Sequence, residues 1–351
     1  MRVLFEAHWW TSGPPSLRRV LRDSVSTWRK QYPDDELAIL VPFHDAASVR
    51  ADLPGVRVFL TRLRPQALSA SIGSIFAARK FNADAVITHN FTSFSRRSRR
   101  VVLIHDFLFL DHPEWFTFAE RLYFRAMPMM ARRATVVLAT SESEADRIRR
   151  YLPDREIRAI GLGLSEELRG VPQRKVSGLD RGSFLLCVGR LNSRKNLLRT
   201  IRGCLAAGVL SAGMPLVVVG APDGRQDVLP MDVMNAISER IVVYTGYTSD
   251  AELAWLYGSC KLFIFLSLGE GYGLPPIEAL YFGARVLVSD LPVFRETLGD
   301  AATYCDPLDS DQIALAITTA VHERVEPKHV SNDIGLGWEA VVREMRSASL
   351  G

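Results

Sequence analysis

Short apolar runs alternate with amphipathic stretches along the whole chain. The first series of apolar runs predicts strands at residues 2–6, 37–41, 56–60, 85–89, 101–105 and 135–139. A second series predicts strands at residues 184–188, 216–219, 241–245, 262–266 and 286–289. Continuously apolar strands separated by helical patterns are typical of parallel sheets that helices cover on both faces. The predicted fold class is therefore α/β, with two doubly wound parallel-sheet domains and ligands at the carboxyl ends of the strands.

The stretch between the two series has the composition of a linker. Residues 161–183 contain several glycines and few apolar anchors, which predicts a hinge rather than a packed element. We therefore expect an N-terminal domain over residues 1–165, a linker over 166–183 and a C-terminal domain over 184–330. A chain of 351 residues is long enough for two cores of ordinary size.

Two helix starts support this register. In the runs Ser141–Glu144 and Ser249–Glu252, a serine is followed three residues later by a glutamate. This spacing predicts a capping box, in which the serine hydroxyl and the glutamate carboxylate each accept a hydrogen bond from a backbone N–H at the start of the helix.

The strongest candidate site follows the apolar run 262–266 and has the sequence EGYGLPPIEAL, from Glu270 to Leu280. Its glycines let the backbone approach a ligand, and its two prolines suit the first turn of a helix. The amides around Gly273 and Leu274 then lie at the positive end of a helix dipole, which predicts a phosphate-binding turn.

Two carboxylates flank this turn. Glu270 is expected in the loop and Glu278 in the first turn of the helix, so both can accept hydrogen bonds from the hydroxyls of one ligand. The alternative is that Glu278 only complements the helix dipole and Glu270 is solvated.

A second candidate turn spans residues 188–196, between a strand and a helix. Arg190 can bind phosphate oxygens with two hydrogen bonds, and Lys195 supplies a compact second charge. Together they would neutralise a diphosphate without a metal ion. The alternative is an ordinary turn with solvated bases.

Composition limits the other classes of function. The chain is 48% hydrophobic and 23% charged, as in a soluble globular protein, and it has no apolar run of roughly 20 residues. Glu6 interrupts the apolar start, unlike a signal peptide, so we expect a cytoplasmic protein. The four cysteines lie far apart without a CxxC pair, so zinc spacing is absent and we expect them in the core. We expect no metal and no cofactor.

The charge is unevenly distributed. Residues 1–165 hold 25 Lys and Arg against 17 Asp and Glu, a net charge of +8, whereas the remainder carries −4. The arginines between Arg96 and Arg100 lack the interleaved aromatic residues of a base-stacking surface, so we expect no nucleic acid. A solvated loop is one interpretation; an anionic membrane surface or a phosphorylated acceptor is the other. For the aromatic stretch 107–130, the alternatives are core packing and membrane contact.

These motifs, together with the turn Gly246–Leu253, resemble the large family-4 group of retaining glycosyltransferases, most specifically across about residues 184–306. The resemblance implies the GT-B fold: two Rossmann-like domains with the active site in the cleft between them. It implies that Glu278 binds the ribose and Glu270 the transferred sugar. It further implies that Arg190 and Lys195 bind the diphosphate of the donor, and that Tyr247 lies near its base.

The N-terminal domain resembles the family at fewer points and would hold the acceptor side. His105 and Asp106 resemble a His-Asp pair that faces the donor sugar. Gly13 stands where relatives carry a Gly-Gly loop near the donor phosphates, with one glycine replaced. The final segment, residues 331–351 with Trp338, resembles the helix that crosses back to the N-terminal domain.

The function implied is retaining, metal-independent transfer of a hexose or deoxyhexose from a nucleotide diphosphate sugar to a glycan or lipid-linked acceptor. The stretch from His105 to Phe116 resembles bacterial mannosyl- and rhamnosyltransferases of surface-polysaccharide assembly. The resemblance then implies a cytoplasmic protein that associates peripherally with the inner face of the membrane. Two alternatives stay open: a GT-B nucleotide-sugar epimerase, and a catalytically silent subunit that binds a nucleotide sugar.

Overall fold

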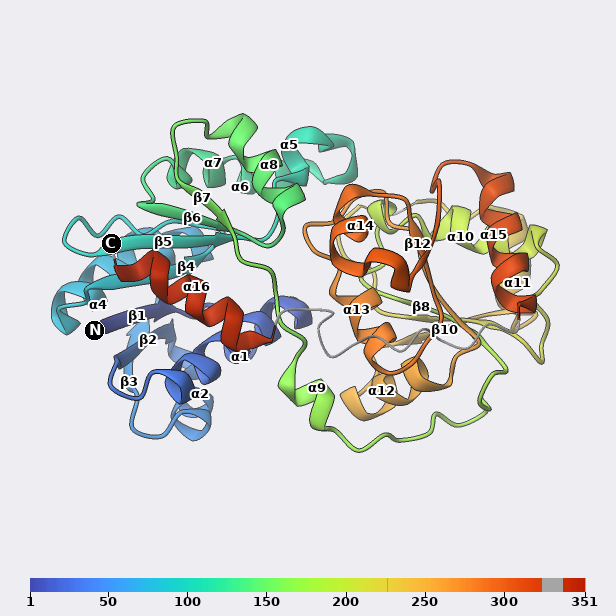
Figure 1. Ribbon diagram of the computed structural model, residues 1–351, viewed down its shortest axis with the longest axis horizontal. Helices are drawn as coiled ribbons and strands as arrows, with labels where there is room; N and C mark the ends of the chain where they lie inside the picture. The colour runs from blue at the N-terminus through green and yellow to red at the C-terminus, as the bar shows by residue number, and fades with distance from the viewer. Residues whose placement is uncertain (226, 324–336, 351) are drawn as a thin grey trace. The chain divides into compact units, whose positions relative to one another are not determined.

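The computed structural model describes residues 1–225, 227–323 and 337–350 and divides into two compact units. Unit 1 comprises Met1–Phe107, Arg121–Ser165 and the described C-terminal residues 337–350. Unit 2 comprises Leu108–Glu120 and the described residues from 166 to 323. Each unit contains one parallel sheet with helices on both faces (Figure 1), which confirms the predicted α/β class with two Rossmann-like domains.

The sheet of unit 1 has seven parallel strands in the order β3-β2-β1-β4-β5-β6-β7. Their bounds are β1 Arg2–Glu6, β2 Glu36–Pro42, β3 Arg57–Thr61, β4 Ala85–His89, β5 Arg99–Ile104, β6 Val136–Ala139 and β7 Ile157–Ala159. The apolar pattern did not predict β7, because this three-residue edge strand is only half-buried.

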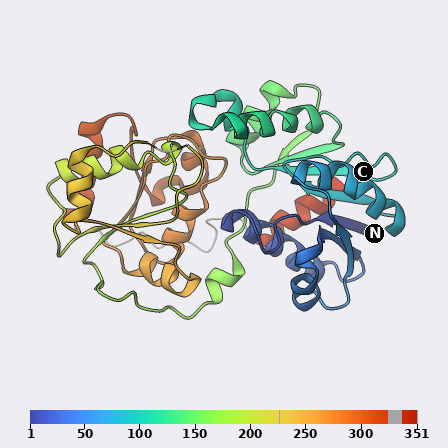
Figure 2. The same ribbon diagram turned by 180° about the vertical axis from the view of Figure 1, so that it is seen from behind.

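Helices cover both faces of this sheet because adjacent strand residues point to opposite sides. Leu4 packs in the cluster around α4, whereas the ring of Phe5 meets Trp28 of α1 at 5.4 Å. Figures 1 and 2 show α1 and α16 on one face and α4 on the other. The helices are α1 Pro15–Gln31, η1 Phe43–Asp45, α2 Ala46–Asp52, α3 Gln66–Leu68, η2 Ser69–Gly73, α4 Ser74–Phe81, α6 Phe118–Phe124, α7 Ala126–Ala131, α8 Glu142–Tyr151 and α16 Trp338–Leu350.

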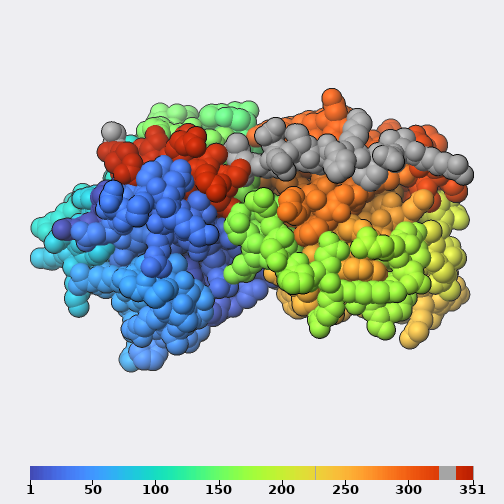
Figure 3. Space-filling model, turned by 60° about the horizontal axis from the view of Figure 1, so that its bottom comes forward, coloured from blue at the N-terminus to red at the C-terminus, as the bar shows by residue number. Residues whose placement is uncertain are grey.

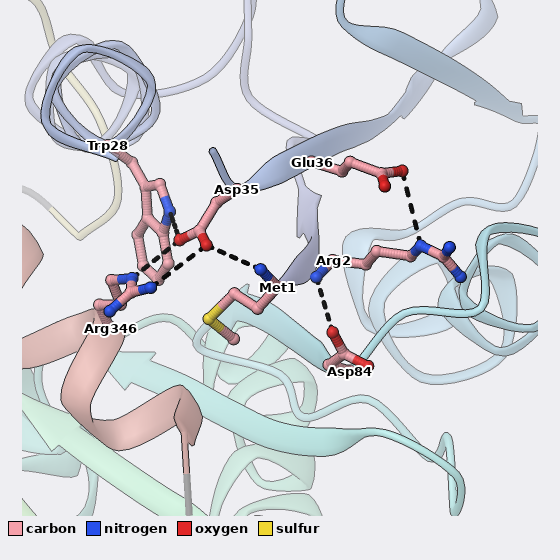
Figure 4. Close-up of polar contacts among 7 residues, drawn as sticks. All are labelled: Met1, Arg2, Trp28, Asp35, Glu36, Asp84 and Arg346. Atoms are coloured by element: carbon pink, nitrogen blue, oxygen red, sulfur yellow. Dashed lines mark hydrogen bonds and ion pairs between the residues drawn. The ribbon is translucent and has the colours of Figure 1, made fainter. Parts of the chain in front are cut away.

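The C-terminal helix α16 is fastened to unit 1 through Asp35. The carboxylate of Asp35 accepts hydrogen bonds from Arg346 at 2.8 Å, from the amino group of Met1 at 2.8 Å and from Trp28 at 3.1 Å (Figure 4). Burial alone would raise the pKa of Asp35, but these donors lower it. Figure 3 shows α16 lying along the surface of α1. Of the predicted segment 331–351, residues 331–336 and 351 lie outside the described residues.

The sheet of unit 2 has six parallel strands in the order β10-β9-β8-β11-β12-β13. Their bounds are β8 Leu185–Val188, β9 Leu216–Val219, β10 Val242–Gly246, β11 Leu262–Phe265, β12 Val286–Ser289 and β13 Thr303–Cys305. The helices are α5 Leu108–Asp111, η3 Pro113–Trp115, α9 Glu166–Gly170, η4 Ser193–Lys195, α10 Leu197–Ala206, α11 Met231–Ser238, α12 Asp250–Ser259, α13 Leu274–Tyr281, α14 Pro292–Leu298, η5 Gly299–Ala301 and α15 Ser310–His322. Within the described residues, none of the helices is both long and apolar enough to cross a bilayer.

The two predicted helix starts have different outcomes. At α12 the capping box is complete, because Ser249 and Glu252 each accept a backbone hydrogen bond from the other residue. At α8 the hydroxyl of Ser141 accepts from the N–H of Glu144, as predicted. The carboxylate of Glu144 instead accepts from the backbone N–H of Phe107 at 2.8 Å. This glutamate therefore links α8 to the end of β5.

Candidate functional site

Two strand-to-helix turns of unit 2 meet because their strands, β8 and β11, are neighbours in the sheet. The backbone N–H of Leu268 donates to the carbonyl of Arg194 at 2.8 Å. In return, Nη1 of Arg194 donates to the carbonyl of Gly269 at 2.6 Å. These reciprocal bonds join the turn after β8 to the turn after β11.

Three charged side chains lie where the turns meet. Nζ of Lys195 is 2.6 Å from Oε1 of Glu270, and Nη1 of Arg194 is 2.8 Å from Oε2 of the same carboxylate. The side chains of Lys195, Arg194 and Glu270 are only 13%, 8% and 10% exposed. The structure thus brings together two predicted site residues, Lys195 and Glu270, and adds Arg194.

The charges of this cluster are strongly coupled. Burial alone would raise the pKa of Glu270, but Arg194 and Lys195 lower it to about 2. Burial lowers the pKa of Lys195 to about 8, although Glu270 opposes that shift. At neutral pH two cations therefore surround one carboxylate, which leaves one net positive charge in a largely dry site. Such a charge favours binding of an anion.

The turn after β8 is shaped around Lys195. Gly189 has φ +153°, and a Cβ there would lie 3.3 Å from Cε of Lys195. The ammonium lies 4.3 Å from the centre of the Phe265 ring, at a distance suited to a cation–π interaction. A cavity of about 20 Å³ beside these residues has room for roughly one water molecule.

Helix α13 begins at Leu274, with Gly273 as its N-cap. Gly273 has φ +91°, and a Cβ there would lie 2.5 Å from the ring of Phe294, so only glycine fits. As the N-cap residue, Gly273 has no side chain to cap this end of the helix. A helix start of this kind suits an anion-binding turn.

Glu278 lies one turn further along α13 than predicted. The helix begins at Leu274, so no acidic residue stands in its first turn and Glu278 falls in the second. The carboxylate is buried and accepts a hydrogen bond from the hydroxyl of Tyr257 at 2.8 Å. The placement in the first turn was wrong, because the helix begins at Leu274 and its first turn ends before Glu278.

Arg190 lies earlier in the turn after β8, and Tyr247 lies on the loop after β10, at the same edge of the sheet. Arg190 is exposed and donates to Asp223 in the loop after β9 at 3.0 Å. Tyr247 follows the end of β10 and is 71% exposed. Neither residue joins the buried cluster. Their predicted contacts with a diphosphate and a base stay predictions.

Unit 1 gathers a different set of polar residues at its strand ends. Nδ1 of His89, the last residue of β4, is 3.0 Å from Nε2 of His105, which follows β5. Burial lowers the pKa of His89 to about 4 and that of His105 well below its usual range. Both rings are therefore neutral near pH 7, so one of the two nitrogens donates and the other accepts.

Two buried carboxyl groups flank this histidine pair. Glu6, at the end of β1, accepts from Ser69 at 2.8 Å and from Gln66, which also donates to the carbonyl of His89 at 3.1 Å. Burial raises the pKa of Glu6 to about 7 and that of Glu144 to about 8.

Asp106 and Gly13 are the two remaining candidate residues of unit 1, and they lie far apart in the sequence. The charge of Asp106, which is half-buried, contributes to the raised pKa of Glu144. Gly13 has φ +82°, and a Cβ there would lie 2.7 Å from the Trp9 ring, so this turn requires glycine. Proximity of either residue to a donor stays a prediction.

Four residues of these clusters were not singled out from the sequence: Arg194, Asp223, Glu6 and His89. Glu6 and His89 end strands at the carboxyl edge of a parallel sheet, and this position was a signal that could have identified them. Arg194 directly precedes Lys195, and nothing in the pattern indicated that Arg194 also points into the cluster. In the part of the chain that the structure describes, no three His, Cys, Asp or Glu residues form a group that could hold a metal ion.

Comparisons with known families agree with this architecture. Residues 172–334 match the family of "Glycosyl transferases group 1", and residues 27–168 match "Glycosyltransferase Family 4". The fold and these two matches define the chain as a GT-B glycosyltransferase by family. More particularly, it belongs to the family-4 glycosyltransferases, and its sequence is similar to those of mannosyltransferases of surface-polysaccharide assembly.

Individual relatives are similar to this chain at modest sequence identity. The chain is 28% identical to O-antigen chain mannosyltransferase B of Escherichia coli over 67% of its own length and 64% of that protein. It is 29% identical to O-antigen chain mannosyltransferase RfbU of Salmonella typhimurium over 62% of its length and 60% of that protein. The alignments thus span less than two thirds of these relatives.

Solved structures share the fold at lower identity. Sucrose-phosphate synthase from Thermosynechococcus elongatus superimposes with a TM-score of 0.69 at 16% identity, covering 99% of this chain and 98% of that one. WaaG, a glycosyltransferase involved in lipopolysaccharide biosynthesis, gives 0.63 at 14% identity, covering 98% and 95%. At such low sequence identity, these similarities show a shared fold only.

Proposed function

We propose that the chain is a retaining glycosyltransferase that moves a hexose, in first place mannose, from a nucleotide diphosphate sugar to a glycan or lipid-linked acceptor. The buried cluster of Lys195, Arg194 and Glu270 carries this proposal, because its net positive charge suits the diphosphate of such a donor. The mannosyltransferases among the relatives support the choice of sugar.

In the proposed reaction, the bond between the anomeric carbon and the diphosphate breaks, and a bond to the acceptor oxygen forms on the same face. The departing phosphate oxygen takes the acceptor proton. Negative charge develops on the leaving diphosphate, and Lys195, Arg190 and the amides that begin α13 stabilise it. We propose that no metal ion or cofactor takes part.

Glu270 stays ionised in this scheme because its neighbours lower its pKa to about 2. Each carboxylate oxygen has two acceptor positions. The ion pairs to Lys195 and Arg194 occupy one position on each oxygen, so Glu270 keeps capacity to accept hydrogen bonds from sugar hydroxyls. Glu278 would accept from the ribose in the same way.

A panel of nucleotide diphosphates tests the donor site directly. A ligand that binds the native state raises the unfolding free energy, by about 2.7 kcal/mol at a concentration about 100 times Kd. One base should therefore raise the melting temperature most, and the matching mannosyl donor should support transfer. NMR of the product should show the anomeric configuration of the donor. No thermal shift with any nucleotide, and no transfer, would reject the proposal. Conversion of the sugar without an acceptor would favour an epimerase.

We further propose that the acceptor is presented at an anionic membrane surface. Residues 1–165 carry a net charge of +8. In the same helical run, Ile72 and Phe76 are exposed and precede the exposed bases Arg79 and Lys80. Such a surface should sediment with anionic vesicles less strongly as salt rises, because exposed charges are screened within about 10 Å at about 0.1 M. Equal sedimentation with neutral vesicles, or none with either kind, would overturn it.

A further inference from the structure

One segment of the chain belongs to a different unit from its neighbours in sequence. The chain completes β5 in unit 1, and then residues Leu108–Glu120 pack as part of unit 2 before the chain returns to unit 1 at Arg121. We call Leu108–Glu120 the excursion segment; it contains α5 and η3. Neither the predicted domain boundary nor the proposed function accounts for its position.

The excursion segment covers the backbone next to Glu270. A Cβ on Gly269 would lie 2.9 Å from Cζ3 of Trp115 and 3.0 Å from Cδ2 of Leu108, so these side chains occupy the space that a larger residue would need. The carbonyl of Gly269 accepts the hydrogen bond from Arg194 at 2.6 Å. Gly269 is therefore fixed both by packing of Trp115 and Leu108 and by the buried arginine of the charged cluster.

The same segment also contacts the loop that follows β9. Nη1 of Arg225 donates to the backbone carbonyl of Glu114 at 2.7 Å. A Cβ on Gly224 would lie 3.1 Å from Oε1 of Glu120, so the carboxylate packs against that glycine. Asp223, which pairs with Arg190, directly precedes these residues. One segment thus contacts both the loop that holds Glu270 and the loop whose Asp223 pairs with Arg190.

Contacts within the segment hold Trp115 in place. Its ring stacks on His112 with centroids 3.9 Å apart and planes 12° from parallel. Its backbone N–H donates to the carbonyl of His112 at 3.1 Å. At the end of the segment, Glu120 accepts from the N–H and the hydroxyl of Thr117, each at 2.8 Å. The segment therefore presents Trp115 in a defined orientation.

We propose that the excursion segment is a clamp of the donor site, and that Trp115 is a positioning residue that holds Gly269 and thereby Glu270. This inference rests on the proposed function for its chemical meaning. Trp115 acts on the sugar end of the donor, because Glu270 is the proposed partner of the sugar. The nucleotide end is bound by other residues and should not depend on it.

Replacing Trp115 by alanine tests this division. Displacement of a reacting group by about 1 Å costs on the order of 100-fold in rate, so turnover of Trp115→Ala should fall by about that factor. Calorimetry should show weaker binding of the nucleotide sugar and unchanged binding of the nucleotide diphosphate. Phe118→Ala is the matched control, because it removes an aromatic side chain of the same segment that is 74% exposed. Equal weakening of both ligands, or parental behaviour, would overturn the proposal.

A double-mutant cycle tests the contact itself. Gly269 has no left-handed backbone conformation, and the atoms nearest to a Cβ there belong to Trp115 and Leu108. Gly269→Ala should therefore reduce transfer strongly in the parent and less in the Trp115→Ala background. Side chains in contact show such non-additive effects. Additive losses in the cycle would mean that Trp115 does not act through Gly269.

Hydrogen exchange of the ligand-free protein separates this inference from the proposed function. Trp115→Ala should speed amide exchange in a peptide covering residues 266–272, whereas Phe118→Ala should not. Faster exchange together with no nucleotide binding by the parent would keep the clamp and reject the proposed function. Unchanged exchange together with normal nucleotide binding would reject the clamp and keep the proposed function.

Discussion

The two units place polar clusters at equivalent edges of their sheets but control charge in opposite ways. In unit 2, Glu270 is buried between two cations, and its pKa falls to about 2. In unit 1, Glu6 is also buried but meets mainly neutral partners, Ser69 and Gln66, and its pKa rises to about 7. The same type of residue at the same type of strand end is therefore held as an anion in one unit and close to neutrality in the other.

The physical reason is the partner rather than the burial. Burial penalises the charged form of both carboxyl groups, and at Glu270 the two adjacent cations outweigh that penalty. Neutral hydrogen-bond donors reduce the penalty around Glu6 but do not remove it. Unit 2 thus holds fixed charges at its strand ends, whereas Glu6, His89 and His105 of unit 1 have pKa values shifted towards their neutral forms.

The largest effect is expected at the charged cluster. Lys195→Ala should lower turnover by roughly 100- to 1000-fold, the loss typical for one group that stabilises charge in the transition state. Arg194 still pairs with Glu270 in this variant, so the melting temperature should change much less. Lys175→Ala, which removes an exposed lysine of the same unit, serves as the control in the steady-state assay. A Lys195→Ala enzyme with parental turnover would contradict the role of the cluster.

A large effect on stability is expected at Glu6. Its folded pKa of about 7 lies above the usual 4.5, so its contribution is complete below pH 4.5 and is lost as the pH rises to 7. The loss amounts to on the order of 3 kcal/mol, because each pKa unit corresponds to about 1.4 kcal/mol. Denaturation of the parent and of Glu6→Gln at several pH values should show this difference.

The comparison with Glu6→Gln isolates the carboxyl group. His89 and His105 have lowered pKa values, so their contributions are lost as the pH falls below about 6.5. The unfolding free energy therefore changes with pH in the opposite direction to the effect of Glu6. Both the parent and Glu6→Gln contain the two histidines, so their effect cancels in the difference between the two proteins. A difference in unfolding free energy that stays constant with pH would mean that Glu6 titrates normally.

A smaller and more selective effect is expected at the two glutamates of unit 2. Glu278→Ala should weaken binding of both the donor and the free nucleotide diphosphate, because the ribose is common to both. Glu270→Ala should reduce transfer and spare nucleotide affinity. Tyr257→Phe removes a hydrogen bond to Glu278 and should reduce nucleotide affinity by about 1.5–3 kcal/mol at most. Calorimetry on folded variants measures each. Parental binding and turnover in both glutamate variants would reject the site assignment.

The sequence predicted the architecture well because continuously apolar strands report a sheet buried on both faces. It missed the short edge strands β7 and β13, where three residues carry too little pattern. It also identified both turns that meet in unit 2. The pairing of Lys195 with Glu270 spans 75 positions and follows from strand order, which local periodicity does not encode.

Other features of the site depend on packing that no local pattern reports. The sequence did not indicate that Arg194 joins Lys195 in the cluster. The direction of each side chain depends on the backbone conformation of the turn, which the order of charged residues does not determine. The excursion segment was read as an aromatic stretch with core packing or membrane contact as alternatives. Its contact with Gly269 depends on the shape of two distant loops. Candidate residues can thus be predicted one by one, whereas their partners require the fold.

The smallest expected effect is that of removing divalent metal ions. Lys195 and Arg194 outnumber the single carboxylate between them, and Arg190 adds a more exposed charge in the same turn. These fixed cations would do for the diphosphate what a metal ion does in other transferases, since both act by placing positive charge on the leaving group. Excess chelator should therefore leave the steady-state rate near its starting value. The comparison becomes sharper in Lys195→Ala, where added magnesium should restore part of the lost rate if positive charge alone is missing. A parent enzyme that loses activity with chelator and regains it with magnesium or manganese would show that the cluster of unit 2 does not suffice.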